Sequence, residues 1–193
     1  MRVIAGTARS MPLKTREGKD TRPTTDRIKE TLFNVLQGYV QESVFFDLFS
    51  GSGGIGIEAI SRGAKHAYFV ENDAKAIECI VDNLKFTKFT DRATVLKQDV
   101  VSALNGISEK EVDIIFMDPP YDQFFEKRVL EVLATKNYVT DNTLIVVETS
   151  LRTDFDYLDN LGFEVEKEKR YKTNKHVFVK RRKKWKKDSK QLW

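Results

Sequence analysis

Short apolar runs recur along the middle of the chain, and they are separated by segments in which apolar residues follow helical spacing. The apolar runs occupy residues 43–49, 67–71, 93–99, 112–118 and 143–149. Several are apolar at consecutive positions, which is typical of strands covered on both faces of a parallel sheet. The intervening helical segments are residues 55–63, 74–86 and 124–135. Strands that alternate with helices predict βαβ units, and therefore an α/β fold with a mostly parallel sheet.

The last part of the pattern differs from the middle. Residues 162–182 alternate between apolar and polar positions on both sides of the turn-like residues 172–175. Strict alternation indicates strands with one buried and one exposed face, and the short interruption indicates a hairpin. We therefore expect an antiparallel pair of strands that closes one edge of the sheet.

The first 40 residues predict a small extension before the sheet. Strand-like pieces around Gly6 and Pro12 suggest a hairpin. A helix should follow, with Thr24 or Thr25 as its N-cap and with Asp26 placed favourably in the helix dipole. This unit is too short for a second domain, so we expect an extension of the domain that contains the sheet.

One domain can accommodate the whole pattern, because 193 residues with 40% hydrophobic content suffice for a single α/β core. We expect an extension at 1–40, a catalytic core at 41–182 and a basic tail at 183–193. No segment approaches the roughly 20 consecutive apolar residues of a membrane span, and no secretory signal is visible. Cys79 is alone and only two histidines occur, which predicts no disulfide and no structural metal. A cytoplasmic protein without a membrane partner is expected.

Positive charge gathers at the two ends of the chain. Residues 180–190 carry eight Lys and Arg against one Asp, and residues 1–30 carry eight basic and four acidic side chains, although the net charge of the whole chain is only +4. Concentrated Lys and Arg are the electrostatic signature of binding to a polyanion. A solvated basic tail is the alternative. Trp185 and Trp193 allow either stacking on bases or packing onto the domain.

A glycine-rich loop follows the first predicted strand. Gly51, Gly53 and Gly56 form the pattern G-x-G-x-x-G, and the residues after them turn helical. Glycine lets the backbone approach a bound nucleoside closely, because no side chain occupies the place of the ligand. Glu71 ends the next strand, where a carboxylate can bind both hydroxyls of a ribose. This arrangement predicts a nucleoside-cofactor site, which dinucleotides and S-adenosylmethionine share; a purely structural glycine turn is the alternative.

Asp99 adds a third polar residue at a strand end. It follows the third predicted strand, next to the place expected for an adenine, where its carboxylate can accept a hydrogen bond from the adenine amine. It can equally cap the helix that follows, and the two roles are compatible. The three strand ends meet at the carboxyl edge of the sheet, which is where open α/β sheets bind ligands.

The corner Asp118-Pro119-Pro120-Tyr121 ends the fourth predicted strand. Asp118 and the Pro119 carbonyl can accept hydrogen bonds from the two hydrogens of an amine, and the prolines fix the local backbone. Tyr121 offers an aromatic face to an extruded base. The corner resembles the (N/D/S)-P-P-(Y/F/W) motif of methyltransferases that act on exocyclic amines.

The resemblance extends along residues 1–180 to the RsmD family, through "RPTTDRIKETLFNVL", "DLFSGSGGIGIEAISRGA", "VENDAKAIECIVDNL" and "DIIFMDPPY". It implies a Rossmann-like class I methyltransferase fold with a seven-stranded sheet, helices on both faces and an antiparallel carboxyl-terminal hairpin. The implied reaction is methylation of the exocyclic N2 amine of one guanine in 16S rRNA, in the small ribosomal subunit or an assembly intermediate. S-adenosylmethionine is the implied cofactor.

The resemblance also implies roles for individual residues. Arg22, Pro23 and Tyr121 should border the target, and Asp118 to Tyr121 should hold the guanine amine. The cofactor should be bound by Thr25, Asp47, Phe49, Gly51, Gly53, Gly56, Glu71, Asn72, Asp99 and Val100. Two features depart from the family pattern: Lys172 stands where a glycine often follows the tyrosine of the last hairpin, and the basic tail beyond Arg182 is long.

Other functions stay open at this point. A methyltransferase that acts on an adenine amine in DNA or RNA, or on a protein amine, would use the same corner, although the chain has no room for a separate DNA-recognition domain. A dinucleotide-dependent oxidoreductase would explain the glycines but not the prolines. A non-catalytic RNA-binding module is disfavoured by the intact Asp118, Glu71 and glycines. We expect a monomer.

Overall fold

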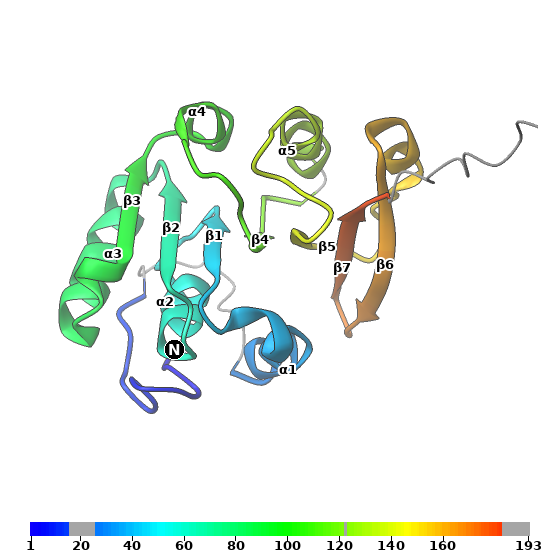
Figure 1. Cartoon of the computed structure of the whole chain (residues 1–193). Coiled ribbons are helices and arrows are strands. Elements are labelled where there is room, and N and C mark those ends of the chain that lie inside the picture. Colours follow the sequence, from blue (N-terminus) through cyan, green and yellow to red (C-terminus); the bar gives the residue numbers. More distant parts are fainter. Residues whose placement is uncertain (16–25, 122, 183–193) are drawn as a thin grey trace, which may run out of the picture.

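The computed structural model describes residues 1–15, 26–121 and 123–182. Its centre is a seven-stranded sheet with the strand order β3-β2-β1-β4-β5-β7-β6 (Figure 1). Strands β1 to β5 pair with one another in parallel, whereas β7 is antiparallel to both β5 and β6. The strands are β1 (Val44–Leu48), β2 (His66–Glu71), β3 (Ala93–Lys97), β4 (Ile114–Met117), β5 (Leu144–Ser150), β6 (Phe163–Arg170) and β7 (Asn174–Arg181). The predicted mostly parallel sheet and its antiparallel hairpin are confirmed.

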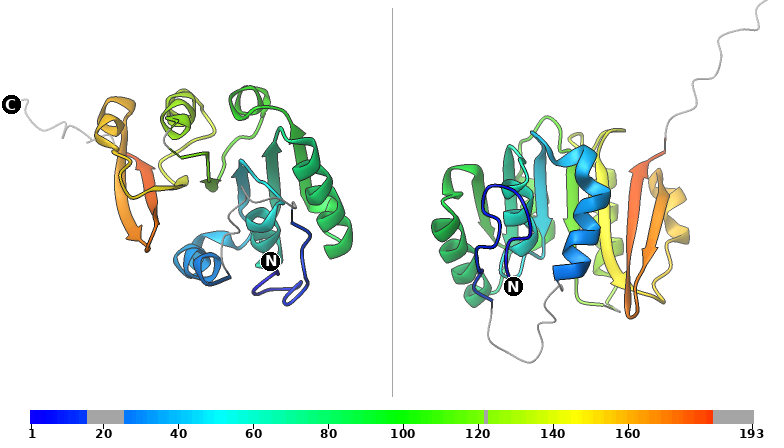
Figure 2. Two further views of the ribbon diagram at one scale, coloured as in Figure 1. Left: turned by 180° about the vertical axis from the view of Figure 1, so that it is seen from behind. Right: turned by 90° about the horizontal axis from the view of Figure 1, so that it is seen from below.

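Helices cover both faces of the sheet, as Figures 1 and 2 show. One face carries α1 (Asp26–Val40), α2 (Gly54–Ser61) and α3 (Ala74–Thr87), with the short η1 (Thr90–Arg92) after α3. The other face carries α4 (Val100–Gly106), α5 (Phe125–Ala134) and η2 (Asp156–Leu161). Phe45 and Phe46 of β1 are both fully buried, one in each of the two cores that result. This double cover explains why the parallel strands are apolar at consecutive positions.

The amino-terminal segment is fastened to the glycine-loop helix by a buried carboxylate. Glu58 of α2 is fully buried and accepts hydrogen bonds from the backbone N–H of Ile4 at 2.8 Å and of Ala5 at 3.0 Å. The same carboxylate pairs with Lys29 of α1 at 3.2 Å and with Arg62 at 2.7 Å. Burial lowers the pKa of Lys29, and Glu58 opposes this shift. One acid thus joins three segments that are far apart in the sequence.

The predicted amino-terminal hairpin takes a reduced form, since its one named pairing is an isolated antiparallel bridge between Arg2 and Pro12. At the other end, the hairpin of β6 and β7 turns through residues 171–173. Lys172 is not among the residues with positive φ, so its difference from the family's glycine does not impose a left-handed backbone here.

Several predictions fall outside the described residues. They concern Arg22, Pro23, the cap at Thr24 or Thr25, and the basic tail at 183–193. Within the described ranges, no helix combines the length and the apolar character needed to cross a membrane.

Candidate active site

A cavity of about 380 Å³ opens at the carboxyl edge of the parallel strands. Six residues of its wall were predicted from the sequence: Phe49, Glu71, Asn72, Asp99, Val100 and Pro120. They come from the ends of four different strands, because the carboxyl ends of adjacent parallel strands meet at one edge of the sheet. Phe49, the two acids and Pro120 thus share one cavity wall, whereas Gly51, Gly53 and Gly56 are not among its lining residues.

The other half of the wall was not predicted. It consists of Val70, Gln98, Val101, Phe125, Arg128 and Val129. Three of these residues belong to α5, the helix that follows the proline corner. The apolar spacing of residues 124–135 predicted the helix, but a periodic pattern does not tell which of its sides meets a cavity. Tertiary packing of α5 against the sheet decides that.

Phe49 begins the loop in an unusual backbone conformation. Its φ is 61°, in the left-handed region that a bulky side chain rarely adopts. Its ring packs edge-on against Phe125 of α5, with 6.0 Å between ring centroids. Left-handed residues of this kind gather at functional sites, where the surrounding structure compensates the strain. Phe49 thus joins the loop after β1 to the helix after the proline corner.

Glu71 is held in place by the backbone around it. Its carboxylate accepts hydrogen bonds from the N–H groups of Gly51 at 2.9 Å, Asn72 at 2.8 Å and Asp73 at 2.9 Å. The bond to Gly51 links the end of β2 directly to the glycine loop. Two carboxylate oxygens offer about four acceptor positions, so one further hydrogen bond, for example from a ribose hydroxyl, can be accommodated.

Gly56 and Asp47 act beneath the loop and do not line the cavity. A Cβ on Gly56 would come within 2.4 Å of the Phe69 ring, so this glycine permits close packing of α2 on β2. Asp47 is 2% exposed and accepts a hydrogen bond from the Gly56 N–H at 2.8 Å. Burial raises the pKa of Asp47 to about 8. We therefore revise the predicted role of both residues from contact with a cofactor to support of the loop.

Asp99 caps the helix α4 and also lines the cavity. Its Oδ1 accepts a hydrogen bond from the Ser102 N–H at 3.0 Å. The hydrogen bonds with Ser102 lower the pKa of Asp99, which keeps the carboxylate ionised. The capping role is thus confirmed, and contact with an adenine amine stays a prediction that this position permits.

The corner Asp118-Pro119-Pro120-Tyr121 follows β4 at the edge of the same cavity. Pro119 is buried and Pro120 lies in the cavity wall. The hydroxyl of Tyr121 donates a hydrogen bond to Oε1 of Glu148 on β5 at 3.3 Å. Burial raises the pKa of Tyr121 above its ordinary value of 10.0, and the charges of Asp118 and Glu148 raise it further. The phenol is therefore neutral at physiological pH.

A buried polar network surrounds Glu148, the acid that binds the Tyr121 hydroxyl. Glu148 accepts hydrogen bonds from Asn174 Nδ2 at 2.5 Å and from His176 Nε2 at 2.9 Å. The other ring nitrogen of His176, Nδ1, lies 3.1 Å from the Tyr171 hydroxyl. These residues were missed in the sequence. Glu148, an acid within the apolar run 143–149, was the available signal in the sequence. Its partners lie on β7, and they can be identified only when the pairing of β5 with β7 is known.

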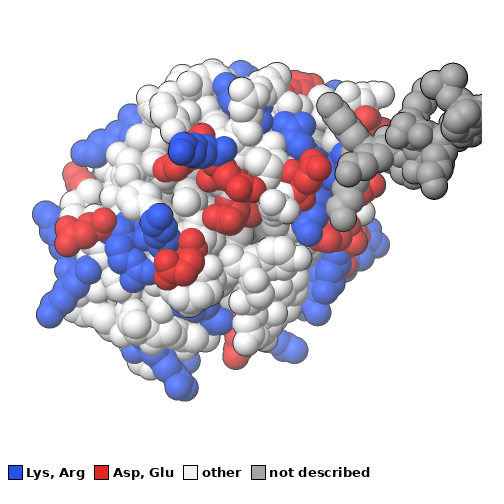
Figure 3. Space-filling model, in the orientation of Figure 1, with Lys and Arg blue, Asp and Glu red and all other residues white. Residues whose placement is uncertain are grey.

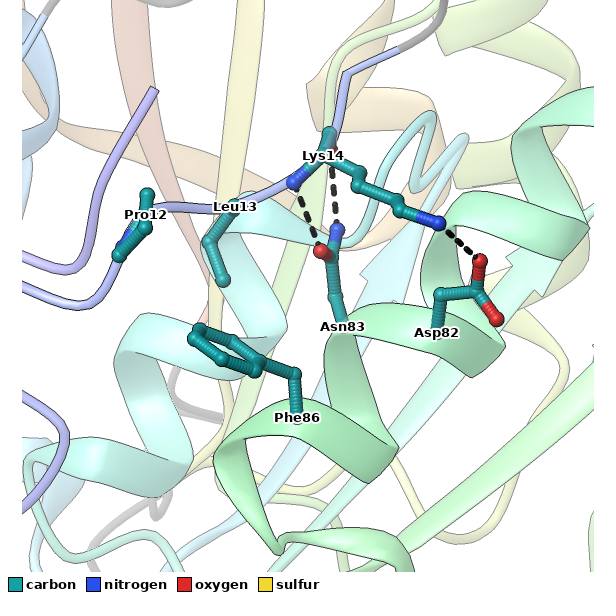
Figure 4. Close-up of a pocket in the computed structure, with 6 residues that line it drawn as sticks. All are labelled: Pro12, Leu13, Lys14, Asp82, Asn83 and Phe86. Carbon is teal, nitrogen blue, oxygen red and sulfur yellow. Dashed lines mark hydrogen bonds and ion pairs between the residues drawn. The ribbon is translucent and has the colours of Figure 1, made fainter.

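The amino-terminal segment also reaches the glycine loop. Asn83 of α3 is 2% exposed, and its Oδ1 accepts from the Lys14 N–H at 2.8 Å while its Nδ2 donates to the Lys14 carbonyl at 2.9 Å (Figure 4). The same Nδ2 donates to the carbonyl of Ser52 at 3.0 Å. Lys14 also pairs with Asp82 at 2.6 Å (Figure 4). The residues that precede position 16 are thus anchored beside the loop.

The charges of the described surface are mixed. On the face shown in Figure 3, acidic and basic side chains are interspersed. Among residues 1–15, 26–121 and 123–182, no group of three or more His, Cys, Asp or Glu side chains is arranged to hold a metal ion.

Comparison with known proteins decides the family. The family described as "Conserved hypothetical protein 95" matches residues 1–180. The chain belongs to this family. "Putative rRNA methyltransferase YlbH" of Bacillus subtilis is 41% identical over 150 residues, which are 77% of this chain and 82% of the relative. "Ribosomal RNA small subunit methyltransferase D" of Haemophilus influenzae is 36% identical over 151 residues, 77% of this chain and 78% of the relative. The resemblance to the RsmD family is confirmed.

A solved structure confirms the class of fold. The Escherichia coli protein described as "Putative methyltransferase yhhF" superposes with a TM-score of 0.83 at 29% identity, covering 94% of this chain and 97% of that chain. This chain therefore has the class I methyltransferase fold. Its strand order is β3-β2-β1-β4-β5-β7-β6, with the antiparallel hairpin next to β5.

Proposed function

We propose that this member of the family transfers a methyl group from S-adenosylmethionine to the exocyclic N2 amine of a guanine in 16S rRNA of the small ribosomal subunit, in the cytoplasm. The observation that carries the proposal is the position of the Asp118 to Tyr121 corner, since Pro120 lies in the same cavity wall as Phe49, Glu71 and Asp99. The names of the relatives support rRNA as the substrate class.

Two acids and two apolar side chains in the cavity wall support S-adenosylmethionine as the cofactor. Glu71 can accept one hydrogen bond from a ribose hydroxyl and Asp99 one from an adenine amine, while Val100 and Phe49 offer apolar walls to the adenine ring. Gly51 and Gly53 both have positive φ and keep the loop free of side chains at its tip. S-adenosylmethionine supplies an activated methyl group on its sulfonium sulfur.

The corner acts on the amine. A guanine amine is a weak nucleophile because its lone pair is delocalised into the ring. Asp118 and the Pro119 carbonyl accept hydrogen bonds from its two hydrogens, which draws the nitrogen toward tetrahedral geometry and aims the lone pair at the methyl carbon. The new N–C bond forms as the S–C bond breaks, and one amine proton then departs to Asp118 or to water.

Tyr121 positions the base. With its hydroxyl bound to Glu148, the phenol ring has a fixed place beside the amine site and offers a face for stacking. RNA is recognised largely through its shape, its exposed bases and its phosphates, so a prefolded RNA can supply the choice of target. The basic tail at 183–193 would add attraction to phosphates.

Labelled methyl transfer tests the proposal. Small subunits isolated from a strain that lacks the modification should accept label, and naked 16S rRNA and DNA serve as competing substrates. Digestion of the labelled RNA to nucleosides should give N2-methylguanosine. Label in DNA adenine with none in the subunits would replace the proposed function by that of an adenine methyltransferase. Calorimetry should show binding of S-adenosylmethionine and not of NAD.

A further inference from the structure

Phe124 combines two unfavourable features at the start of α5. Its φ is 56° and its ψ is 21°, a left-handed conformation that costs free energy for a bulky side chain. Its side chain is also 70% exposed, more than the other large exposed apolar residues, which reach 53% at Phe86. Neither the strain nor the exposure benefits the fold. An observed backbone outlier of this kind is a reason to look for a function.

The position of Phe124 places it beside the proposed target. Phe124 lies three positions after Tyr121 in the sequence, so their Cα atoms lie within about 11 Å of each other. The next residue, Phe125, packs its ring on Phe49 in the cavity wall. Phe124 therefore adjoins both the proline corner and the cavity, but it is itself open to solvent.

Arg128 adds a cation one helical turn later. Its backbone N–H donates to the carbonyl of Phe124 at 3.2 Å, and Arg128 is one of the residues that line the cavity. No ion pair of the Arg128 guanidinium is found with another side chain in the described part of the protein. An exposed ring next to an available guanidinium is the combination that single-stranded nucleic acids bind, through base stacking and phosphate contacts.

We propose that Phe124 and Arg128 form an RNA-binding element outside the proline corner, in which Phe124 stacks on the unpaired base next to the target and Arg128 contacts a phosphate. This inference rests on the proposed function. Extrusion of a guanine leaves the neighbouring base without its stacking partner, and an aromatic face can receive any base. Stacking covers the exposed ring and offsets the backbone strain.

The substitution Phe124→Gly separates stability from RNA binding. Glycine adopts positive φ freely, so the variant should melt at the same temperature as the wild type or at a higher one. Its affinity for unmodified small subunits should fall about tenfold, because one stacked base is lost. Affinity for S-adenosylmethionine should not change. Phe124→Trp should restore RNA affinity and Phe124→Leu should not, since stacking needs a ring.

Phe86→Ala is the matched control, because Phe86 is the other strongly exposed phenylalanine and lies on α3 beside Pro12 and Leu13 of the amino-terminal segment (Figure 4). It should retain wild-type RNA affinity. Arg128→Gln should reduce the slope of log affinity against log salt by about 1, whereas Phe124→Gly should leave that slope unchanged.

Two results would overturn the inference: wild-type RNA affinity in Phe124→Gly, or a loss of cofactor affinity in that variant, which would make Phe124 part of the cofactor site. Binding is measured without methyl transfer. A wild-type protein that binds rRNA but does not methylate it would refute the proposed function alone, and the comparison with Phe124→Gly would still decide the inference. No RNA binding by the wild type would refute both.

Discussion

The cofactor loop and the proline corner face the same cavity but are held in different ways. The cofactor loop, which lies within residues 47–73, is fixed mainly by contacts inside this stretch, since Asp47 binds Gly56 and Glu71 binds Gly51. Asn83 of α3 adds one hydrogen bond to the Ser52 carbonyl from outside the stretch. The proline corner, residues 118–121, is fixed from a distance, since Tyr121 depends on Glu148 of β5. A local arrangement can be encoded in a motif, whereas a distant one depends on the completed sheet.

This difference predicts that the two regions fail separately. Changes in the cofactor loop should alter cofactor affinity with the target side intact, and changes in the corner should alter transfer with cofactor affinity intact. A change in the buried contacts that support the helices around the site should instead lower the stability of the whole domain. The variants below separate these outcomes.

Glu58→Ala should have the largest effect, because Glu58 lies beneath the loop helix. The substitution leaves the buried Lys29 ammonium without its acid and two backbone N–H groups without an acceptor. Removing one partner of a buried ion pair costs roughly 3–5 kcal/mol of unfolding free energy. Urea denaturation measures it. Glu78→Ala, at an exposed acid on α3, should stay within about 0.5 kcal/mol of the wild type. Equal losses in both variants would contradict the role of Glu58.

Asp118→Ala should reduce methyl transfer by about 10²–10³, which corresponds to the loss of one hydrogen bond made to the reacting group in the transition state. Cofactor affinity should stay within a few-fold, because Asp118 belongs to the corner. Single-turnover transfer and calorimetry measure the two quantities. Asp141→Ala, at an exposed acid before β5, is the control for the loss of a surface charge. A large drop in the cofactor affinity of Asp118→Ala would instead show that Asp118 binds the cofactor.

The site residues that could be predicted from the sequence are those held by local contacts, and those held by distant contacts could not be predicted. Glu71 and Asp99 were predictable because each lies at or just after the carboxyl end of a strand, and neighbouring parallel strands end at the same edge. Phe49 was named through the family resemblance. Glu148 and His176 were not, because their contact depends on the antiparallel register in which they pair across β5 and β7. A sequence shows that both strands exist but does not fix which residues face each other.

The roles of Asp47 and Gly56 needed the structure for another reason. The glycine motif predicts that a ligand approaches the loop, but it does not distinguish the glycines that line a cavity from those that let a helix pack. The close approach of Phe69 to Gly56 decides this, and it depends on how α2 lies over β2.

Glu71→Ala should weaken binding of S-adenosylmethionine by about 10- to 100-fold, because charge-assisted hydrogen bonds contribute roughly 1.5–3 kcal/mol. The substitution also leaves the Gly51 N–H without its acceptor, so the loop loses its link to β2. Glu71→Gln keeps one acceptor oxygen, so its affinity for S-adenosylmethionine should lie between that of the wild type and that of Glu71→Ala. Transfer at saturating cofactor should recover most of the wild-type rate. Unchanged cofactor affinity in Glu71→Ala would remove this residue from the site.

Tyr121→Phe should have the smallest effect, and it tests how much the distant anchor contributes. The variant keeps the ring for stacking and loses only the hydroxyl that reaches Glu148. A single hydrogen bond contributes about 0.5–1.5 kcal/mol, so the transfer rate should fall by about 2- to 10-fold at unchanged cofactor affinity. Tyr171→Phe removes a hydroxyl from the same network one step further away, at His176, and should reduce transfer less. If both variants transfer at the wild-type rate, the ring of Tyr121 is held by packing alone, and the proline corner is as local a structure as the cofactor loop.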